Sequence, residues 1–153
     1  DEIVHICAGS GLVPNFSILK HALHVYPELK HRMVISNKTY DDIIFRDKLI
    51  ELQRKHPQRL ELAFSLTRQE DKSLTLQDID ISFGRISQEL LGKIVDSEKQ
   101  QHFMVCGPAI SKYDKKKAKA EGVLPQPRFL ETVMNHLDAL GVQQGQITKE
   151  SYG

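Results

Sequence analysis

Residues 3–14 read IVHICAGSGLVP, and the rest of the chain is arranged around them. The apolar, partly β-branched run at residues 3–8 predicts a short buried strand. The small residues 9–11 then allow a tight turn that leaves backbone amides uncovered. Pro14 suits the first turn of a following helix, because its missing N–H is not needed there. Together these features predict a site for phosphate or pyrophosphate, since free amides and the helix dipole both face the anion.

The Gly-Ser-Gly turn by itself leaves two interpretations open, a phosphate site and a purely structural turn. It lacks the third glycine of the usual dinucleotide-binding fingerprint, and no Gly-Lys-Ser/Thr follows that would make a P-loop. Residues further along the chain are needed to decide between the two.

Length and composition narrow the class of protein. The 153 residues suit one domain with a sizeable core. A formal charge of +1 leaves no basic excess, so we expect no nucleic-acid partner. The sequence has neither an apolar run of transmembrane length nor a signal-peptide pattern, so we expect no membrane partner. The chain starts without methionine, almost inside its first strand, and we interpret it as a fragment cut at a domain boundary.

The cysteines and histidines predict no metal centre in this segment. Cys7 and Cys106 are too few for a disulfide scaffold or an iron–sulfur cluster. Their apolar surroundings suit reduced thiols in a cytoplasmic protein. The seven histidines show no metal-ligand spacing, so we assign none to a metal.

Strand and helix patterns alternate along the chain. Strands are expected at residues 3–8, 33–35, 60–66, 102–106 and 146–149. Helices are expected at residues 14–26, 41–52, 84–94 and 129–140, the second led by Asp41 and Asp42. Residues 69–80 should form a surface loop with a short element at its end, and the lysine-rich residues 112–119 a solvated helix or loop. This alternation predicts an α/β fold with an open, mostly parallel five-stranded sheet and helices on both faces.

Small, polar or reactive residues follow each predicted strand. Ligands bind beyond the carboxyl ends of the strands in such sheets. The residues at these ends are 9–11, Asn37, Lys38, Thr67, Arg68, 106–108 and Glu150. Because five strand ends converge on one edge, the phosphate site is favoured over the purely structural turn.

The same segments resemble the ferredoxin–NADP reductase superfamily. GSGLVP at residues 9–14 resembles its Gly-Thr/Ser-Gly-Ile-x-Pro turn, and CGP at residues 106–108 its Cys-Gly-Pro segment. DIIFRDKL at residues 42–49 is similar to its second helix, and residues 67–68 lie where some members carry Ser-Arg. ESY at residues 150–152 is similar to the Glu-x-aromatic end of the nicotinamide domain. The match runs through the whole chain in the right order.

The resemblance implies that residues 1–153 are the pyridine-nucleotide-binding domain of an oxygenase-type flavin reductase. An FAD-binding barrel would precede the segment, and a [2Fe-2S] ferredoxin-type domain could follow it, with Gly153 at the cut point. The implied reaction is hydride transfer from NADH or NADPH to FAD, then release of single electrons to an iron–sulfur centre serving a terminal oxygenase. The chemistry belongs to the cofactors, so the protein mainly orients them. The isolated domain is not expected to be active alone.

Residue roles follow from the same resemblance. The turn of Gly9, Ser10 and Gly11 would cradle the pyrophosphate, where a side chain on either glycine would block close approach. Pro14 would shape the entry to the helix. Asn37 and Lys38 would lie on the adenosine side.

The nicotinamide side is assigned to the last two strand ends. Cys106 would lie beside the nicotinamide ring, with Gly107 and Pro108 letting the cofactor pass close by. Glu150 would lie near the site of hydride transfer, and Tyr152 near the isoalloxazine. Two alternatives stay open: Cys106 can be a small buried strand residue, and Glu150 a solvated carboxylate.

The choice between NADH and NADPH depends on the end of the third strand. Arg68, beside Thr67, can pair with a 2′-phosphate as a charge-assisted fork, which favours NADPH. The Lys-x-Tyr partner that often accompanies such an arginine is not evident between Glu70 and Arg85. The choice stays open, with a lean to NADH as the usual donor of oxygenase reductases.

Two other classes of function are alternatives to the reductase. A non-catalytic dinucleotide-binding or sensing module would use the same edge, and an upstream barrel carrying Arg-x-Tyr-Ser/Thr would distinguish the reductase from it. A flavodoxin-like or receiver-like signalling domain is disfavoured. Receivers require an acidic cluster after the first strand and an aspartate after the third, where this chain has Gly9, Ser10, Thr67 and Arg68.

Overall fold

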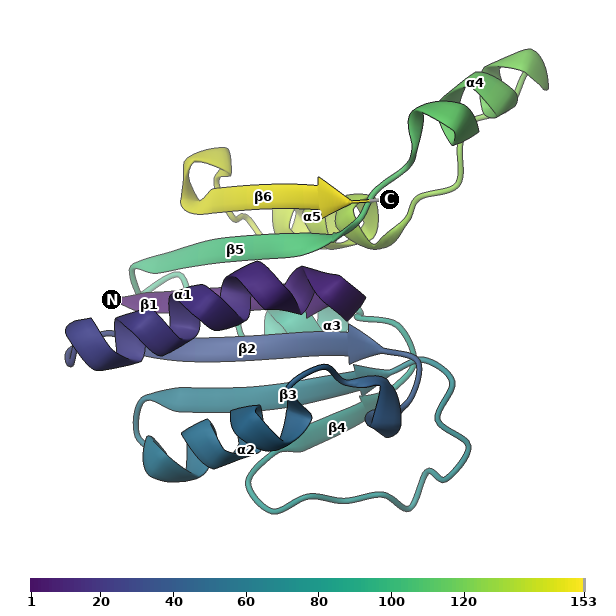
Figure 1. The fold of residues 1–153 in the computed structure, drawn as a ribbon. Coiled ribbons are helices and arrows are strands. Elements are labelled where there is room, and N and C mark those ends of the chain that lie inside the picture. Colours follow the sequence, from purple (N-terminus) through teal and green to yellow (C-terminus); the bar gives the residue numbers. More distant parts are fainter. Residues whose placement is uncertain (153) are drawn as a thin grey trace.

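The computed structural model describes residues 1–152 as one parallel sheet covered by helices on both faces (Figure 1). Gly153, the expected cut point, lies outside the described residues. The strand order is β4-β3-β2-β1-β5-β6. The strands are β1 Glu2–Ala8, β2 Lys30–Asn37, β3 Leu60–Leu66, β4 Asp80–Phe83, β5 Gln101–Pro108 and β6 Ile147–Tyr152. The predicted α/β class and parallel sheet are confirmed, with six strands in place of five.

The helices are α1 Leu12–Val25, α2 Arg46–Lys55, α3 Gln88–Gly92, α4 Lys112–Ala120 and α5 Phe129–Ala139, with short 3₁₀ turns η1 Gly9–Gly11, η2 Tyr40–Asp42 and η3 Gln144–Gln146. Helices α1 and α2 form a layer on one face of the sheet, α3 and α5 form a layer on the other, and α4 lies outside both layers (Figure 1). One core cluster joins α1 and α2 to the sheet, and a second joins α3 and α5 to the opposite face. Successive residues of β1 supply both clusters, Cys7 the first and Ile6 the second. This central strand is therefore buried on both faces, as expected for a parallel sheet.

The sixth strand, β4, was not predicted. It has four residues and lies at the edge of the sheet, paired with β3 in the register Ala63↔Asp80 to Leu66↔Phe83. Both Asp80 and Phe83 are exposed, so the segment has neither a buried run nor a clean alternation of apolar and polar residues. The sequence pattern predicts only a short element at the end of the surface loop at residues 69–80, and backbone pairing with β3 makes residues 80–83 a strand.

The predicted start of α2 is also wrong. Asp41 and Asp42 belong to the 3₁₀ turn η2, and α2 begins only at Arg46. Phe45, between the two, adopts a left-handed conformation with φ 56°, which is uncommon for an aromatic residue. Its ring stacks on Phe16 of α1 at 4.7 Å between centroids. The contact joins α1 to the residue before α2, at the point where the predicted helix is interrupted. The helical pattern of the sequence does not reveal this interruption.

The chain order creates a switch point between β1 and β5. From β1 the chain builds the sheet outward through β2, β3 and β4, and then returns to the other side of β1 for β5 and β6. The connections after β1 and β5 therefore leave on opposite faces of the sheet, and a crevice forms at the carboxyl ends between them. No helix within residues 1–152 is both long and apolar enough to cross a bilayer.

Candidate functional site

The turn after β1 begins the candidate site. Gly9 has φ +54°, a conformation that glycine adopts without strain. Residues 9–11 form the 3₁₀ turn η1, which runs directly into α1. Within residues 1–152 no side chain caps the start of α1, and its first turn holds no acidic residue, although Pro14 lies there as predicted. The dipole of a 14-residue helix therefore meets the crevice without a competing carboxylate.

Gly11 is positioned by the neighbouring strand. A Cβ at this residue would overlap the backbone carbonyl of Cys106. The absence of a side chain thus lets the β1–α1 turn approach the end of β5. The expectation that Gly11 also leaves room for a phosphate stays a prediction.

Gly107 has a comparable packing role. A Cβ there would overlap the ring of Phe129, the first residue of α5. The glycine therefore allows α5 to pack on the end of β5. Both glycines hold the edges of the crevice close together.

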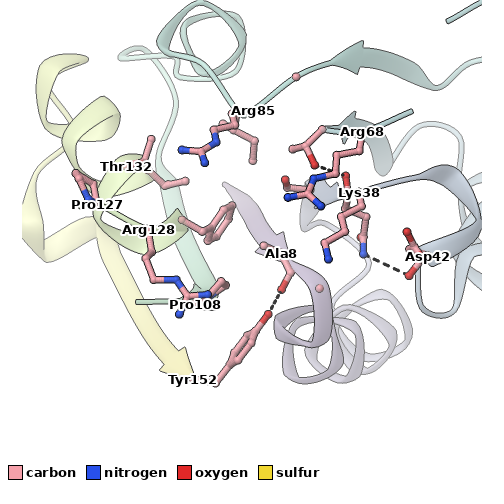
Figure 2. Close-up of a pocket in the computed structure, with 18 residues that line it drawn as sticks. Ala8, Lys38, Asp42, Arg68, Arg85, Pro108, Pro127, Arg128, Thr132 and Tyr152 are labelled. Carbon is pink, nitrogen blue, oxygen red and sulfur yellow. Dashed lines mark hydrogen bonds between the residues drawn. The ribbon is translucent and has the colours of Figure 1, made fainter. Parts of the chain in front are cut away.

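A cleft of about 750 Å³ opens at the carboxyl edge of the sheet (Figure 2). It is lined by Ala8, Gly9, Ser36, Asn37, Lys38, Asp42, Thr67, Arg68, Gly84, Arg85, Ile86, Pro108, Pro127, Arg128, Phe129, Thr132, Val133 and Tyr152. The structure thus brings together seven of the residues predicted for the site: Gly9, Asn37, Lys38, Thr67, Arg68, Pro108 and Tyr152.

The other predicted residues lie around the cleft without lining it. Ser10 is exposed on the turn, and Gly11, Cys106 and Gly107 are buried. Pro14 is half-buried on α1, and Glu150 is exposed on β6. Their proposed cofactor contacts stay predictions.

Cationic side chains surround the cleft. Lys38, Arg68, Arg85 and Arg128 line it, and none of them takes part in an ion pair within residues 1–152. Asp42 is the one acidic residue among those lining it. Its carboxylate accepts hydrogen bonds from the backbone N–H of Thr39 at 3.2 Å and from the Thr39 hydroxyl at 2.8 Å. The cleft therefore carries an excess of positive charge suited to phosphate groups.

Backbone hydrogen bonds hold together the strand ends that precede three of these cations. The N–H of Arg68 donates to the carbonyl of Lys38 at 2.8 Å, which holds the ends of β2 and β3 together. The N–H of Gly84 donates to the carbonyl of Leu66 at 2.8 Å, so Arg85 follows directly from the pairing of β3 with β4. The three side chains consequently start from adjacent strand ends.

Sequence reasoning missed Arg85 and Arg128 as site residues. Arg85 follows β4 by one glycine, so recognising this strand would have placed it at the same edge as Arg68. Arg128 precedes α5 directly, and its backbone N–H donates to Glu131 Oε1 at 3.0 Å. Sequence position alone gave no sign that the start of α5 faces the turn after β1.

Both cysteines are buried thiols. Burial raises the pKa of Cys7, whose Sγ accepts a hydrogen bond from Asn15 Nδ2 at 2.9 Å. Burial, and then the charge of Glu150, raises the pKa of Cys106. Cys106 and Glu150 are register partners on β5 and β6. Because the raised pKa keeps the thiol protonated near neutral pH, Cys106 is not suited to nucleophilic attack.

Tyr152 closes the cleft at the end of β6. Its hydroxyl donates a hydrogen bond of 2.6 Å to the carbonyl of Ala8, the last residue of β1 (Figure 2). The same hydroxyl lies 2.9 Å from the position that a Cβ on Gly9 would occupy. The aromatic side chain thus lies against the glycine turn. Residues 1–152 contain no group of three or more His, Cys, Asp or Glu residues placed to hold a metal ion.

Comparisons with known proteins agree with this geometry. Residues 5–113 match the family described as Oxidoreductase NAD-binding domain. The chain is 32% identical over 108 residues to a component of the 1,2-phenylacetyl-CoA epoxidase from Escherichia coli (strain K12), covering 68% of this chain and 29% of that protein. It is 32% identical over 111 residues to NADH-cytochrome b5 reductase 2-A of Vanderwaltozyma polyspora, covering 71% of this chain and 35% of that protein.

A solved structure shows the same fold. The CS-b5R domains of human Ncb5or in the NAD⁺ form align with a TM-score of 0.73 and 27% identity, covering 97% of this chain and 36% of that one. The chain thus spans about a third of the length of each of these three proteins.

Proposed function

Because the chain belongs to the oxidoreductase NAD-binding domain family of the ferredoxin–NADP reductase type, we propose that its cleft binds NADH or NADPH and presents the nicotinamide to FAD. The FAD is held mainly by another domain of the same protein. The observation that carries this proposal is the cluster of four cations around the cleft, unpaired within residues 1–152, next to the uncapped start of α1. A dinucleotide brings two linked phosphates to a place where amides, dipole and cations all favour negative charge.

The two halves of the dinucleotide take opposite sides of the switch point. The pyrophosphate lies over the turn of Gly9, Ser10 and Gly11, and the adenosine lies over the ends of β2 and β3, near Asn37 and Thr67. The nicotinamide extends toward the ends of β5 and β6. The distribution of charge supports this orientation, because Lys38, Arg68 and Arg85 follow the ends of β2, β3 and β4.

The flavin, when bound, supplies the electron chemistry by accepting a hydride from nicotinamide C4. The residues of this chain orient the reacting ring. Cys106, a protonated thiol, lies against one side of the nicotinamide, and Gly107 and Pro108 let the cofactor approach the end of β5. Glu150, the register partner of Cys106, helps to align the rings, and Tyr152 lies near the isoalloxazine.

We further propose that the whole protein is an oxygenase-type reductase, passing single electrons through a [2Fe-2S] centre to a terminal oxygenase. The name of the Escherichia coli relative, part of an epoxidase, supports this. The name of the yeast relative, a cytochrome b5 reductase, points instead to a haem protein as acceptor. The absorption spectrum of the purified full-length protein distinguishes them, because a [2Fe-2S] centre adds visible bands to those of the flavin.

Calorimetric titration of the chain with NAD⁺ and NADP⁺ at low salt tests dinucleotide binding. Arg85→Gln and Arg128→Gln should each lower the affinity for both cofactors by about tenfold or more, since each variant removes a charge-assisted hydrogen bond to the cofactor. Arg54→Gln, on the exposed surface of α2, is the matched control and should leave both affinities unchanged. Unchanged binding in the two cleft variants would refute the assignment of the cleft. Binding by the chain without any reductase activity of the full-length protein would favour the sensing module.

A further inference from the structure

Helix α4 projects from the body of the molecule, past the carboxyl ends of β5 and β6 (Figure 1). Only Ala118 of its nine residues is buried. The helix joins β5 to α5, two elements that contribute residues to the cleft. Tertiary packing therefore gives α4 little support, although the two elements that it joins line the candidate site.

The helix is nevertheless specified at both ends by its own sequence. At the start, the Ser111 hydroxyl accepts a hydrogen bond from the N–H of Asp114 at 3.0 Å. At the end, Gly122 has φ +70° and its N–H donates to the carbonyl of Lys119 at 3.2 Å. The N–H of Val123 donates to the carbonyl of Ala118 at 3.0 Å, which completes a Schellman motif. Local hydrogen bonds at its two ends thus define α4, although the helix packs little against the hydrophobic core.

Four lysines form a stripe along this helix. Lys112, Lys115, Lys116 and Lys119 follow the spacing i, i+3, i+4, i+7, which places them on one face. Like charges at this spacing destabilise an isolated helix. No ion pair within residues 1–152 includes any of them. Since the whole chain has a formal charge of only +1, the stripe is a local concentration of charge and not a result of composition.

Apolar side chains are exposed at both ends of α4. Leu124 is 87% exposed and Val123 57% exposed, directly after the turn that ends α4, and Tyr113 at its start is 72% exposed. Leu124 is the most exposed large hydrophobic residue in the part of the chain that is described. A projecting element thus combines positive charge with an apolar tip.

We propose that α4 and residues 121–124 bind the surface of an anionic lipid bilayer. The lysine stripe faces the headgroups, while Val123 and Leu124 enter the interface between headgroups and acyl chains. The proposal stands apart from the proposed dinucleotide chemistry. It is compatible with the absence of a transmembrane run, because binding to the surface requires none. The prediction of no membrane partner rests on the lack of a transmembrane run and of a signal-peptide pattern. A helix that binds the surface of a bilayer needs neither of them.

The composition of the stripe favours a bilayer over a protein partner. Protein–protein interfaces are enriched in arginine and depleted in lysine, and the stripe contains only lysine. A protein partner would also need a concave site to enclose a projecting leucine, whereas a planar bilayer can meet any projecting tip. The charge and shape of α4 therefore fit a lipid surface better than an acidic protein.

Co-sedimentation of the full chain with phosphatidylcholine vesicles, with and without phosphatidylserine, tests the proposal. We expect binding only to the vesicles that contain phosphatidylserine, and its loss at high salt. Changing the four stripe lysines together to glutamine should lower the partition coefficient by about fivefold per lysine, or more than about 100-fold in total. The matched control changes four other exposed lysines to glutamine: Lys30, Lys48, Lys72 and Lys93.

The control variant has the same net charge as the stripe variant and should still bind. Leu124→Ser should weaken binding several-fold with the lysines intact. No binding of the unchanged chain to anionic vesicles, or equal loss in the stripe and control variants, overturns the proposal. Binding to soluble poly-glutamate but not to vesicles overturns it as well, and would assign the stripe to an acidic protein surface. Equal melting temperatures of the stripe variant and the unchanged chain exclude misfolding as the cause of a loss.

Discussion

The Tyr152 hydroxyl donates a 2.6 Å hydrogen bond to the carbonyl of Ala8, so the end of β6 is tied to the end of β1 across the intervening strand β5. This bond joins the two sides of the switch point at which the cleft forms. It also keeps an aromatic side chain, 37% exposed, beside the glycine turn. The width of the cleft therefore depends on a contact made by the last described residue.

Tyr152→Phe should lower the free energy of unfolding by about 1 kcal/mol, because the variant removes one partly buried hydrogen bond. Urea unfolding followed by circular dichroism measures the change. Tyr113→Phe is the control, since that side chain is 72% exposed and makes no hydrogen bond within residues 1–152. Equal losses in the two variants would mean that the bond to Ala8 contributes nothing to stability.

Gly11→Ala should lower the free energy of unfolding by about 2 kcal/mol or more. The new methyl group would overlap the backbone of Cys106, which cannot move aside like a flexible side chain. Gly145→Ala provides the comparison, because no described residue comes within 4 Å of its Cβ position. Similar stability of the two variants in urea would contradict the packing role of Gly11.

Arg68→Ala should lower the affinity for NADP⁺ by about 10- to 100-fold, and the affinity for NAD⁺ much less, if the Arg68 guanidinium holds a 2′-phosphate. Calorimetric titration with both cofactors measures the two ratios. Arg54→Ala serves as the control outside the cleft. Equal losses for the two cofactors would remove the role of Arg68 in selecting between them.

The buried pair His5 and His31 should make stability depend on pH. His5 Nε2 and His31 Nδ1 lie 3.2 Å apart, and the remaining ring nitrogens have no partner within residues 1–152. Burial, and then the neighbouring His31, lowers the pKa of His5 to about 3. Burial, followed by Arg59, lowers the pKa of His31 to about 4, with Glu2 acting in the opposite direction.

The direction of the pH effect follows from these lowered values. Below pH 6.5 the unfolded chain binds protons at both rings while the folded chain does not, so acid favours unfolding. Stability should be fully present above about pH 6.5 and should fall toward pH 4 by about 1 kcal/mol per pH unit for each ring. Urea unfolding at several pH values measures the slope. Replacing both residues by Asn should flatten it, whereas replacing the exposed His21 and His24 should not.

Most of the fold could be predicted from the sequence because most strands and helices are encoded by patterns of neighbouring residues. The strand around Ile6 and the glycine turn after it are encoded in adjacent residues, and the structure places both as predicted. The start of α2 was not predictable in this way. Phe45 takes its left-handed conformation where its ring meets Phe16, 29 positions earlier in the sequence, and no local pattern reports such a contact.

The candidate site was predicted in part for the same reason. Lys38 and Arg68 directly follow strands with clear sequence patterns, so both could be assigned to the carboxyl edge of the sheet, where they line the cleft. Arg85 was missed because β4 is recognisable only through its pairing with β3. Arg128 was missed because the packing of Phe129 on Gly107, which sets the start of α5 against β5, is a tertiary contact.

The pairing of β1 with β5 also bears on how the protein folds. Glu2 of β1 is paired with Gln101 of β5, which lies 99 positions later in the chain. The central strand β1 therefore cannot complete its pairing until this distant segment is available. Such distant contacts slow folding, since the chain must close a long loop before it gains their stabilisation. A nascent chain that ends before Gln101 can pair β1 with β2 but cannot assemble the crevice. The crevice therefore forms only after the residues of β5 have been synthesised.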